Sequence, residues 1–163
     1  MSEFYTLSQE QNTQKGKYLT FQLGKELFAI EISYVTEINN MISIVPLPDT
    51  PAYFKGIISL RGKIIPVIDM RMKLCKQAGT YNARTCIIIL SVDGIRTGLI
   101  VDAVAEVRSI GQEEIEPLPK RKQSNYGNYF QGIGKVKDDL VLILDCKKIL
   151  LEDEMLDLTQ VTS

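Results

Sequence analysis

The chain repeats itself, and this internal duplication limits the folds it can adopt more than any other feature. Residues 55–74 (KGIISLRGKIIPVIDMRMKL) align without gaps with residues 131–150 (QGIGKVKDDLVLILDCKKIL), so that apolar positions, an aspartate and a turn coincide. Residues 18–38 align in the same way with residues 87–107. A collinear series of matches is typical of a duplicated unit, so two equivalent lobes are expected.

Each half of the chain has the pattern of short strands separated by tight turns. Residues 18–23 alternate between apolar and polar side chains, which is the period of a strand with one buried face. The pair Gly24-Lys25 then suits a two-residue hairpin turn. The runs 86–90 and 140–144 are apolar on both faces, as interior strands are. These patterns predict two small β-barrels packed side by side with a groove between them.

Short helices are expected at equivalent places in the two halves. The segment SYVTEI, residues 33–38, is interpreted as a short helix that Ser33 caps, and Asp102 occupies the matching position of the second half. Asp69 and Asp145 each precede a further helix-like stretch. Capping explains both aspartates and their repetition better than a catalytic pair of carboxylates does.

The expected SYVTEI helix offers a candidate contact surface. Val35 and Ile38 lie three residues apart on one helical face and are flanked by Glu37. Two interpretations stay open: the ridge seals its barrel, or it contacts a partner. Arg61 precedes Gly62 in a tight turn, where its guanidinium would project into solvent. Arginine beside an apolar stripe is a residue type enriched at binding hot spots.

The composition excludes most catalytic machinery. None of the 163 residues is a histidine, which removes the Ser-His and Cys-His nucleophiles and the commonest transition-metal ligand. The three cysteines form no CxxC pair, as expected of reduced thiols in a cytoplasmic protein. Neither a metal nor a cofactor is therefore expected. No apolar run approaches the roughly 18 residues that a membrane-spanning helix needs.

Two functions of other classes remain as alternatives. A small carboxylate-dependent hydrolase would place acidic residues in the groove between the lobes. A nucleic-acid-binding protein would use the basic cluster from Lys120 to Lys122, which three aromatic residues follow. The formal net charge of −1 provides no global attraction for nucleic acid or for an anionic membrane.

Three segments resemble the CheW family, the coupling proteins of bacterial chemotaxis. They are residues 18–38 (YLTFQLGKELFAIEISYVTEI), 45–74 (VPLPDTPAYFKGIISLRGKIIPVIDMRMKL) and 97–107 (TGLIVDAVAEV). The most specific element is the stretch KGxxxLRGxxxPVIDxRxK within the second segment. Ala29 stands where the family often has glycine, and Ser59 stands where it often has asparagine.

The resemblance implies a mainly β fold of two intertwined five-stranded SH3-like barrel lobes with a few short helices. It implies a CheW-like domain over residues 17–151. Residues 1–16 are rich in Gln, Ser and Thr and predict a flexible tail, and residues 152–163 predict a helix extension and tail. The lobes would span about residues 17–80 and about residues 84–151, with terminal elements open to exchange.

The resemblance also implies a function, that of a non-catalytic adaptor. Its partners would be the cytoplasmic tips of chemoreceptors and the regulatory domain of the histidine kinase CheA. A free monomer in the cytoplasm would join receptor clusters at the inner face of the membrane, without inserting into it and without nucleic acid. The receptor would contact an apolar groove between the lobes, and the kinase would contact the barrel surfaces. The matching residues, not divided between the two partners, are Val35, Glu37, Ile38, Gly56 and Arg61.

Overall fold

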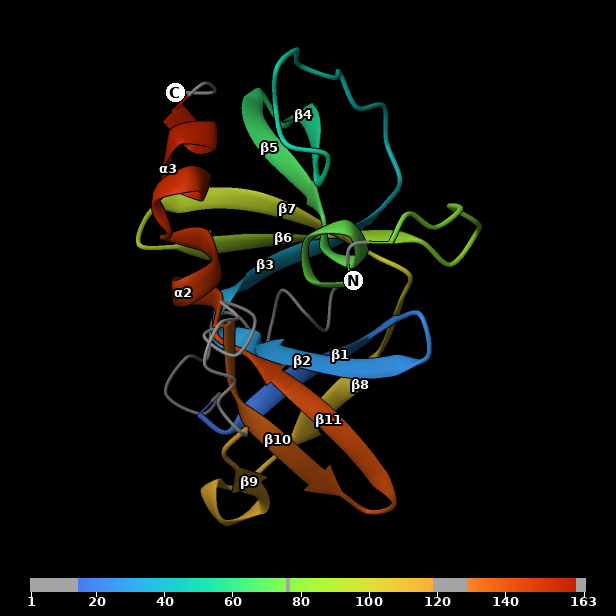
Figure 1. Cartoon of the computed structure of the whole chain (residues 1–163), viewed down its shortest axis with the longest axis vertical. Helices are drawn as coiled ribbons and strands as arrows, with labels where there is room; N and C mark the ends of the chain where they lie inside the picture. Colours follow the sequence, from blue (N-terminus) through green and yellow to red (C-terminus); the bar gives the residue numbers. More distant parts are fainter. Residues whose placement is uncertain (1–14, 76, 119–128, 161–163) are drawn as a thin grey trace.

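A computed structural model describes residues 15–75, 77–118 and 129–160, which form two β-sheets and a few short helices (Figure 1). Most of the expected N-terminal tail and the basic cluster Lys120 to Lys122 lie outside the described residues. No helix within the described part of the chain combines the length and the apolar character that crossing a membrane requires. The prediction of a mainly β, duplicated, two-lobed fold is confirmed.

We call the first sheet lobe A. Its strands lie in the order β8-β1-β2-β11-β10-β9. Their bounds are β1 (Lys17–Leu23), β2 (Glu26–Glu31), β8 (Ala103–Ser109), β9 (Ile115–Glu116), β10 (Phe130–Val136) and β11 (Asp139–Leu144).

We call the second sheet lobe B. Its strands lie in the order β3-β6-β7-β5-β4. Their bounds are β3 (Val35–Asn40), β4 (Phe54–Leu60), β5 (Lys63–Asp69), β6 (Cys86–Val92) and β7 (Ile95–Val101).

The two lobes are assembled by the same rule and exchange strands between the halves of the chain. In lobe A, β2 pairs in parallel with β11, and β1 pairs antiparallel with β8. In lobe B, the equivalent strands β7 and β6 pair with β5 and β3 in the same two ways. The chain therefore passes from lobe A to lobe B after β2 and returns after β7 (Figure 1). The sequential spans 17–80 and 84–151 describe the repeat, whereas each sheet contains strands from both spans.

The prediction of a helix over SYVTEI is wrong. A single 3₁₀ turn, η2 (Ile32–Tyr34), precedes β3. Ser33 lies inside this turn, and the residue at the cap position is Glu31, whose side chain makes no capping hydrogen bond. Ile38 lies opposite Ile88 in the apolar run of β6, so pairing with this run overrides the helical spacing of a six-residue segment. Asp102 also precedes a strand, β8, rather than a helix.

The capping roles predicted for the two equivalent aspartates are confirmed. Asp69 Oδ1 accepts a hydrogen bond from the backbone N–H of Met72 at 3.1 Å, and Asp145 Oδ1 accepts one from that of Lys148 at 3.1 Å. Asp69 is the last residue of β5, Asp145 directly follows β11, and a short helical segment begins after each aspartate. The remaining helices and helical turns are η3 (Arg71–Cys75), η4 (Gln112–Glu114), α2 (Cys146–Leu150) and α3 (Asp153–Gln160).

A core shared by both lobes explains the strands that are apolar on both faces. In β6, Ile88 and Leu90 belong to the largest apolar cluster, which contains residues of both sheets and of the C-terminal helices. The alternate residues Ile87 and Ile89 belong to a second cluster, which is confined to lobe B. A third cluster, with Val141 and Ile143 of β11, is confined to lobe A. Each central strand therefore buries one face inside its lobe and the other face against the opposite lobe.

A close backbone approach at Gly56 fixes the start of the β4–β5 hairpin. Val45 lies across from Ile57 in an isolated bridge, with Val45 N donating to Ile57 O and Ile57 N to Val45 O, both at 2.9 Å. Gly56 has φ +137°, and a Cβ there would lie 2.1 Å from the carbonyl oxygen of Val45. In lobe A, a Cβ on Gly132 would lie 2.4 Å from the carbonyl oxygen of Glu116. The duplication thus repeats this steric requirement.

We expect Gly56→Ala to destabilise the protein by about 3 kcal/mol or more, because the methyl group meets backbone atoms that cannot move aside. Gly62→Ala is the matched control, since Gly62 also has positive φ (+79°) but has nothing within 4 Å of a built Cβ. Backbone strain alone should cost that variant about 1–2 kcal/mol. Urea denaturation measures both, and equal losses would contradict the steric explanation.

Candidate interaction surface

Two of the residues singled out from the sequence, Glu37 and Arg61, meet as an ion pair on lobe B. Arg61 Nη2 lies 3.0 Å from Glu37 Oε2, and 80% of the arginine side chain is exposed against 16% of the glutamate side chain. Arg61 occupies the β4–β5 turn with φ +53°, which gives it the exposed position expected from the sequence. The pair connects β3, at one edge of the sheet, with the β4–β5 hairpin at the other edge. It therefore brings the two edges of lobe B toward each other, as in a partly closed barrel.

A β-bulge sets the position of Glu37 on β3. The register with β6 shifts between Val35 and Glu37, and the hydroxyl of the intervening Thr36 donates to Ile89 O at 3.1 Å. A bulge re-aims the side chains that follow it. The register between β1 and β8 shifts at the corresponding place in lobe A, between Val104 and Val107, and Glu106 lies within this stretch. The duplication therefore provides one carboxylate at an equivalent bulge in each lobe.

The remaining three residues singled out from the sequence are buried. Val35 and Ile38 are 3% and 7% exposed and pack in the shared core, so the expected apolar ridge is not a surface. This outcome corrects the contact interpretation and favours the sealing one. Gly56 is buried as well, and its close approach to Val45 accounts for the glycine.

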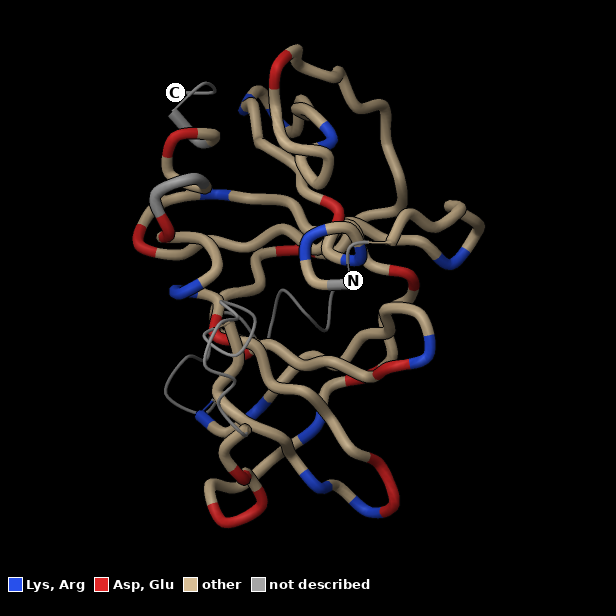
Figure 2. The backbone as a smooth tube through the Cα atoms, viewed as in Figure 1, with Lys and Arg blue, Asp and Glu red and all other residues tan. Residues whose placement is uncertain are grey.

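The equivalent surface of lobe A has a different charge arrangement. Glu106 corresponds to Glu37, but it pairs with Arg108, whose Nε lies 2.7 Å away. Arg108 Nη2 also lies 2.8 Å from Asp139 Oδ2. The hydrogen bonds to Asp139 and then Glu106 raise the pKa of Arg108 above its ordinary value. Lobe A thus holds its guanidinium between two carboxylates beside a hairpin turn that carries both signs of charge (Figure 2), whereas lobe B presents Arg61 outward.

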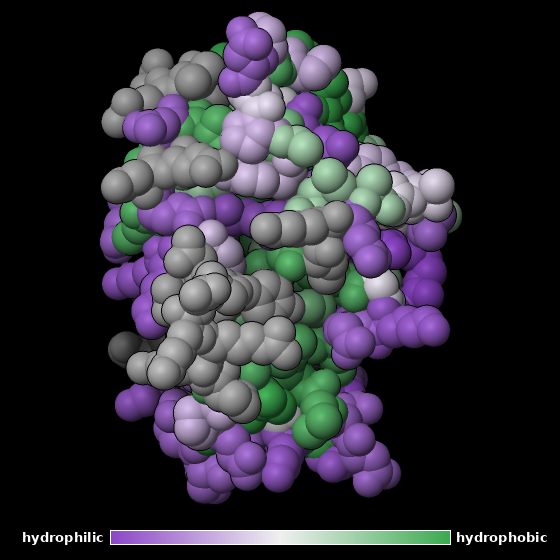
Figure 3. Space-filling model, in the orientation of Figure 1, coloured by the Kyte–Doolittle hydropathy of each residue, from purple (hydrophilic) through white to green (hydrophobic). Residues whose placement is uncertain are grey.

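Sequence reasoning missed the large apolar side chains that the hairpins expose. Ile64 of β5 is 54% exposed and Leu140 of β11 is 64% exposed, and the two occupy equivalent positions of the repeat. Val45, which bridges β4, is 58% exposed. The aligned repeats contained the signal, because both hairpins continue an apolar run up to the turn. On the face seen in Figure 3, apolar side chains gather over lobe A and hydrophilic ones border them below.

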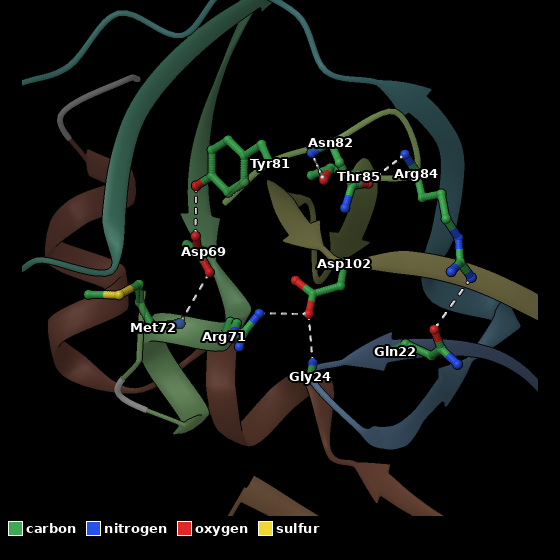
Figure 4. A network of polar contacts seen from close by, with 10 residues as sticks. All are labelled: Gln22, Gly24, Asp69, Arg71, Met72, Tyr81, Asn82, Arg84, Thr85 and Asp102. Atoms are coloured by element: carbon green, nitrogen blue, oxygen red, sulfur yellow. Dashed lines mark hydrogen bonds and ion pairs between the residues drawn. The ribbon is translucent and has the colours of Figure 1, made fainter. Parts of the chain in front are cut away.

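A polar network connects the lobes beside the shared core (Figure 4). Asp102, which lies between β7 and β8, accepts a hydrogen bond from Gly24 N at 2.6 Å and pairs with Arg71 Nη1 at 3.2 Å. Asp69 accepts a further bond from the hydroxyl of Tyr81 at 2.7 Å. Partial burial and then this bond raise the pKa of Tyr81. These carboxylates are engaged in structural contacts, which provides no support for an acidic catalytic pair.

Within the described residues, no three histidine, cysteine, aspartate or glutamate side chains gather as a metal site would need. What the fold and its surface define is a duplicated β protein whose distinctive groups are surface residues at hairpins and edges. This arrangement is suited to contacts with other proteins.

Comparison with known proteins shows the family. The CheW-like domain matches residues 17–154, so the chain belongs to the CheW-like family of chemotaxis scaffold proteins. It is 33% identical over 139 residues to the chemotaxis protein CheW of Klebsiella aerogenes, covering 85% of this chain and 84% of that protein. The CheW of Helicobacter pylori is 34% identical over 145 residues, covering 89% and 87%.

A solved structure has the same architecture. The scaffolding protein TtCheW of Thermoanaerobacter tengcongensis superposes with a TM-score of 0.73 at 38% identity, covering 80% of this chain and 84% of that one. The family resemblance inferred from the sequence is confirmed, and the chain is a chemotaxis scaffold rather than an enzyme.

The burial of Val35 and the exposure of Arg61 generate opposite expectations for stability. Val35→Asp should destabilise the protein by at least about 3 kcal/mol, since it places a carboxylate in the shared core. Arg61→Ala should cost at most about 1 kcal/mol, because an ion pair with one exposed partner contributes little. Thermal unfolding would show the Arg61 variant within about 2–4 °C of the parent. A folded Val35→Asp protein with an unchanged midpoint would contradict the assignment of β3 to the core.

Proposed function

We propose that this chain couples the cytoplasmic tips of chemoreceptors to the histidine kinase CheA as a non-catalytic adaptor. The observation that carries the proposal is the extent of the CheW-like domain, which spans residues 17–154 and therefore both lobes. The whole described fold is then the adaptor. The absence of histidine from the sequence is consistent with a role in binding rather than in catalysis.

The lobe B surface around Arg61 is the first contact site of this proposal. Arg61 exposes its guanidinium, Glu37 holds it from one side, and Ile64 exposes an apolar side chain on the strand that follows the turn. An arginine beside an apolar side chain supplies both a charge that sets register and apolar area that excludes water. Arg61 and Glu37 would therefore contact the receptor or the kinase directly.

The buried residues of the predicted site would support the same surface from the interior of lobe B. They are Val35, Ile38 and Gly56. The first two seat β3 against β6, and Gly56 allows the backbone of β4 to approach Val45. These contacts position the two edges that the ion pair between Glu37 and Arg61 connects. Substitutions at the three buried residues would then weaken binding by distorting lobe B.

The receptor would lie in an apolar groove between the lobes, where a helical tip can bury one apolar stripe. The free protein would be a monomer in the cytoplasm and would join receptor clusters at the inner face of the membrane. Modest affinity for each partner suits an adaptor within a switching array.

Separate titrations with a receptor signalling-tip fragment and with the regulatory domain of CheA test the proposed function. Saturable binding of both to the full chain is the expected result. If the parent protein binds neither fragment, the proposal is wrong. A steep dependence of binding on salt with oligonucleotide alone would support the nucleic-acid alternative instead.

We expect Arg61→Glu to weaken binding of at least one fragment about tenfold or more, because a hot-spot cation is replaced by a repelling charge. Arg96→Glu is the matched control, since Arg96 is an exposed arginine of β7 in the same lobe. The double variant Glu37→Arg/Arg61→Glu restores an ion pair of reversed order. If it binds like the parent, the pair only shapes the lobe and Arg61 does not contact a partner.

A further inference from the structure

Lys73 is a buried cation that the proposed contact surface does not use. The residue is 8% exposed, and its ammonium lies 2.5 Å from Glu152 Oε1. The same ammonium lies 4.2 Å from the ring centroid of Tyr53 and 5.2 Å from that of Tyr129. The hydroxyl of Tyr129 donates to Glu152 Oε2 at 2.7 Å. One charge is thus held by a carboxylate and two aromatic rings.

These four residues come from three separate parts of the molecule. Lys73 lies in η3, which follows β5 of lobe B, and Tyr53 precedes β4 of the same lobe. Tyr129 precedes β10 of lobe A, and Glu152 lies between α2 and α3. We call this cluster of Lys73, Tyr53, Tyr129 and Glu152 the lysine lock.

The duplication explains why the lock lies between the lobes. Tyr53 and Tyr129 are equivalent in the repeat, and the backbone oxygen of each accepts a bond of 2.7 Å from the capping aspartate of its own hairpin. The residue equivalent to Lys73 is Ile149, which is buried in the shared core. The halves have diverged here, so that one cation faces both tyrosines and its counterpart is apolar.

The physics of a buried charge makes this cluster selective for one arrangement. Removing an ammonium from water is costly, and it is tolerated only where partners surround the charge. If lobe A shifted relative to lobe B, the ammonium of Lys73 would lose its contact with the ring of Tyr129. Glu152 would then lose one of its two hydrogen-bond donors, which are Lys73 and Tyr129. Such pairs contribute little net stability, but they penalise alternative arrangements.

The C-terminal helix depends on the same contacts. Glu152 precedes α3, and its backbone oxygen accepts from Leu156 N at 3.0 Å. Met155 and Leu158 of α3 are buried in the shared core. Holding the side chain of Glu152 therefore fixes the first turn of α3 where its apolar face enters that core.

We propose that Lys73 is a positioning residue whose lock holds lobe A, lobe B and α3 in one arrangement. Release of the lock lets α3 detach and the lobes shift slightly against each other, while the shared apolar cluster and the cluster inside each lobe keep both sheets folded. The second and third clusters contain none of the lock residues, and each is confined to one sheet.

Native-state hydrogen exchange of the full chain tests the lock. In Lys73→Met, which keeps the length of the side chain without its charge, amides of α3 such as Leu156 should lose protection about tenfold or more. Central amides of β1 and β6 should stay within about threefold of the parent. Lys147→Met is the matched control, because it removes an exposed cation from α2 that lies 4.0 Å from Asp93. That control should leave α3 unchanged.

Two outcomes would overturn the proposal. One is an equal loss of protection in α3, β1 and β6, which would make Lys73 a contributor to global stability alone. The other is unchanged protection of α3. Should Lys73→Met not fold, Glu152→Gln provides the same measurement, since glutamine keeps an acceptor for Tyr129 but removes the negative charge. Failure of that variant to fold would also count against a local lock.

A binding measurement extends the test and rests on the proposed function. Lys73→Met should raise the Kd of a fragment that spans both lobes about five- to tenfold, because binding must first order the lobes. A fragment seated on one lobe should bind as it does to the parent. If the parent binds neither fragment, the proposed function fails while the exchange result still decides the lock.

Discussion

The apolar cluster that both sheets share is the constraint on which the rest of the structure depends. Each central strand is apolar on both faces, so neither lobe can leave its partner without exposing one complete face to water. The strand exchange strengthens this dependence, because the chain crosses between lobes after β2 and again after β7. The two lobes therefore differ at their outer edges while their inner faces are packed together.

The two lobes share the same backbone features but differ in the charges of their surface side chains. The capping aspartates, the bulges at Glu37 and Glu106, and the positive-φ turns at Arg61 and Lys137 recur. These features satisfy backbone geometry, which is the same in both lobes. The ion pairs differ because surface charge is free to diverge once the backbone is fixed. Two lobes of one architecture can in this way present different surfaces to different partners.

The sequence predicted what depends on local pattern and on the repeat. The hairpin at Gly24, the two caps and the two-lobed fold followed from turn residues and from the alignment of the halves. The helix over residues 33–38 failed because its three-residue spacing also fits a bulged strand, and only pairing with β6 decides between them. The exposure of Ile64 was not predicted, because the pattern of one strand does not show which of its two faces the rest of the protein covers. The pairing of Lys73 with Glu152 joins residues far apart in the sequence and has no local signal.

The contrast between the two charged pairs explains how a rigid fold can serve variable partners. The pair between Glu37 and Arg61 lies at the surface, where water screens it and its loss costs the lobe little. The pair between Lys73 and Glu152 is enclosed by two tyrosines, where a misplaced charge would be left without solvation. Under the proposed function, the first pair is the one whose arginine is able to contact a group on another protein, whereas the second pair cannot change partners without a rearrangement of the lobes. The two ion pairs therefore differ in burial rather than in charge or distance. The exposed pair is available for contact with another protein, whereas the buried pair holds the lobes in the arrangement that such a contact requires.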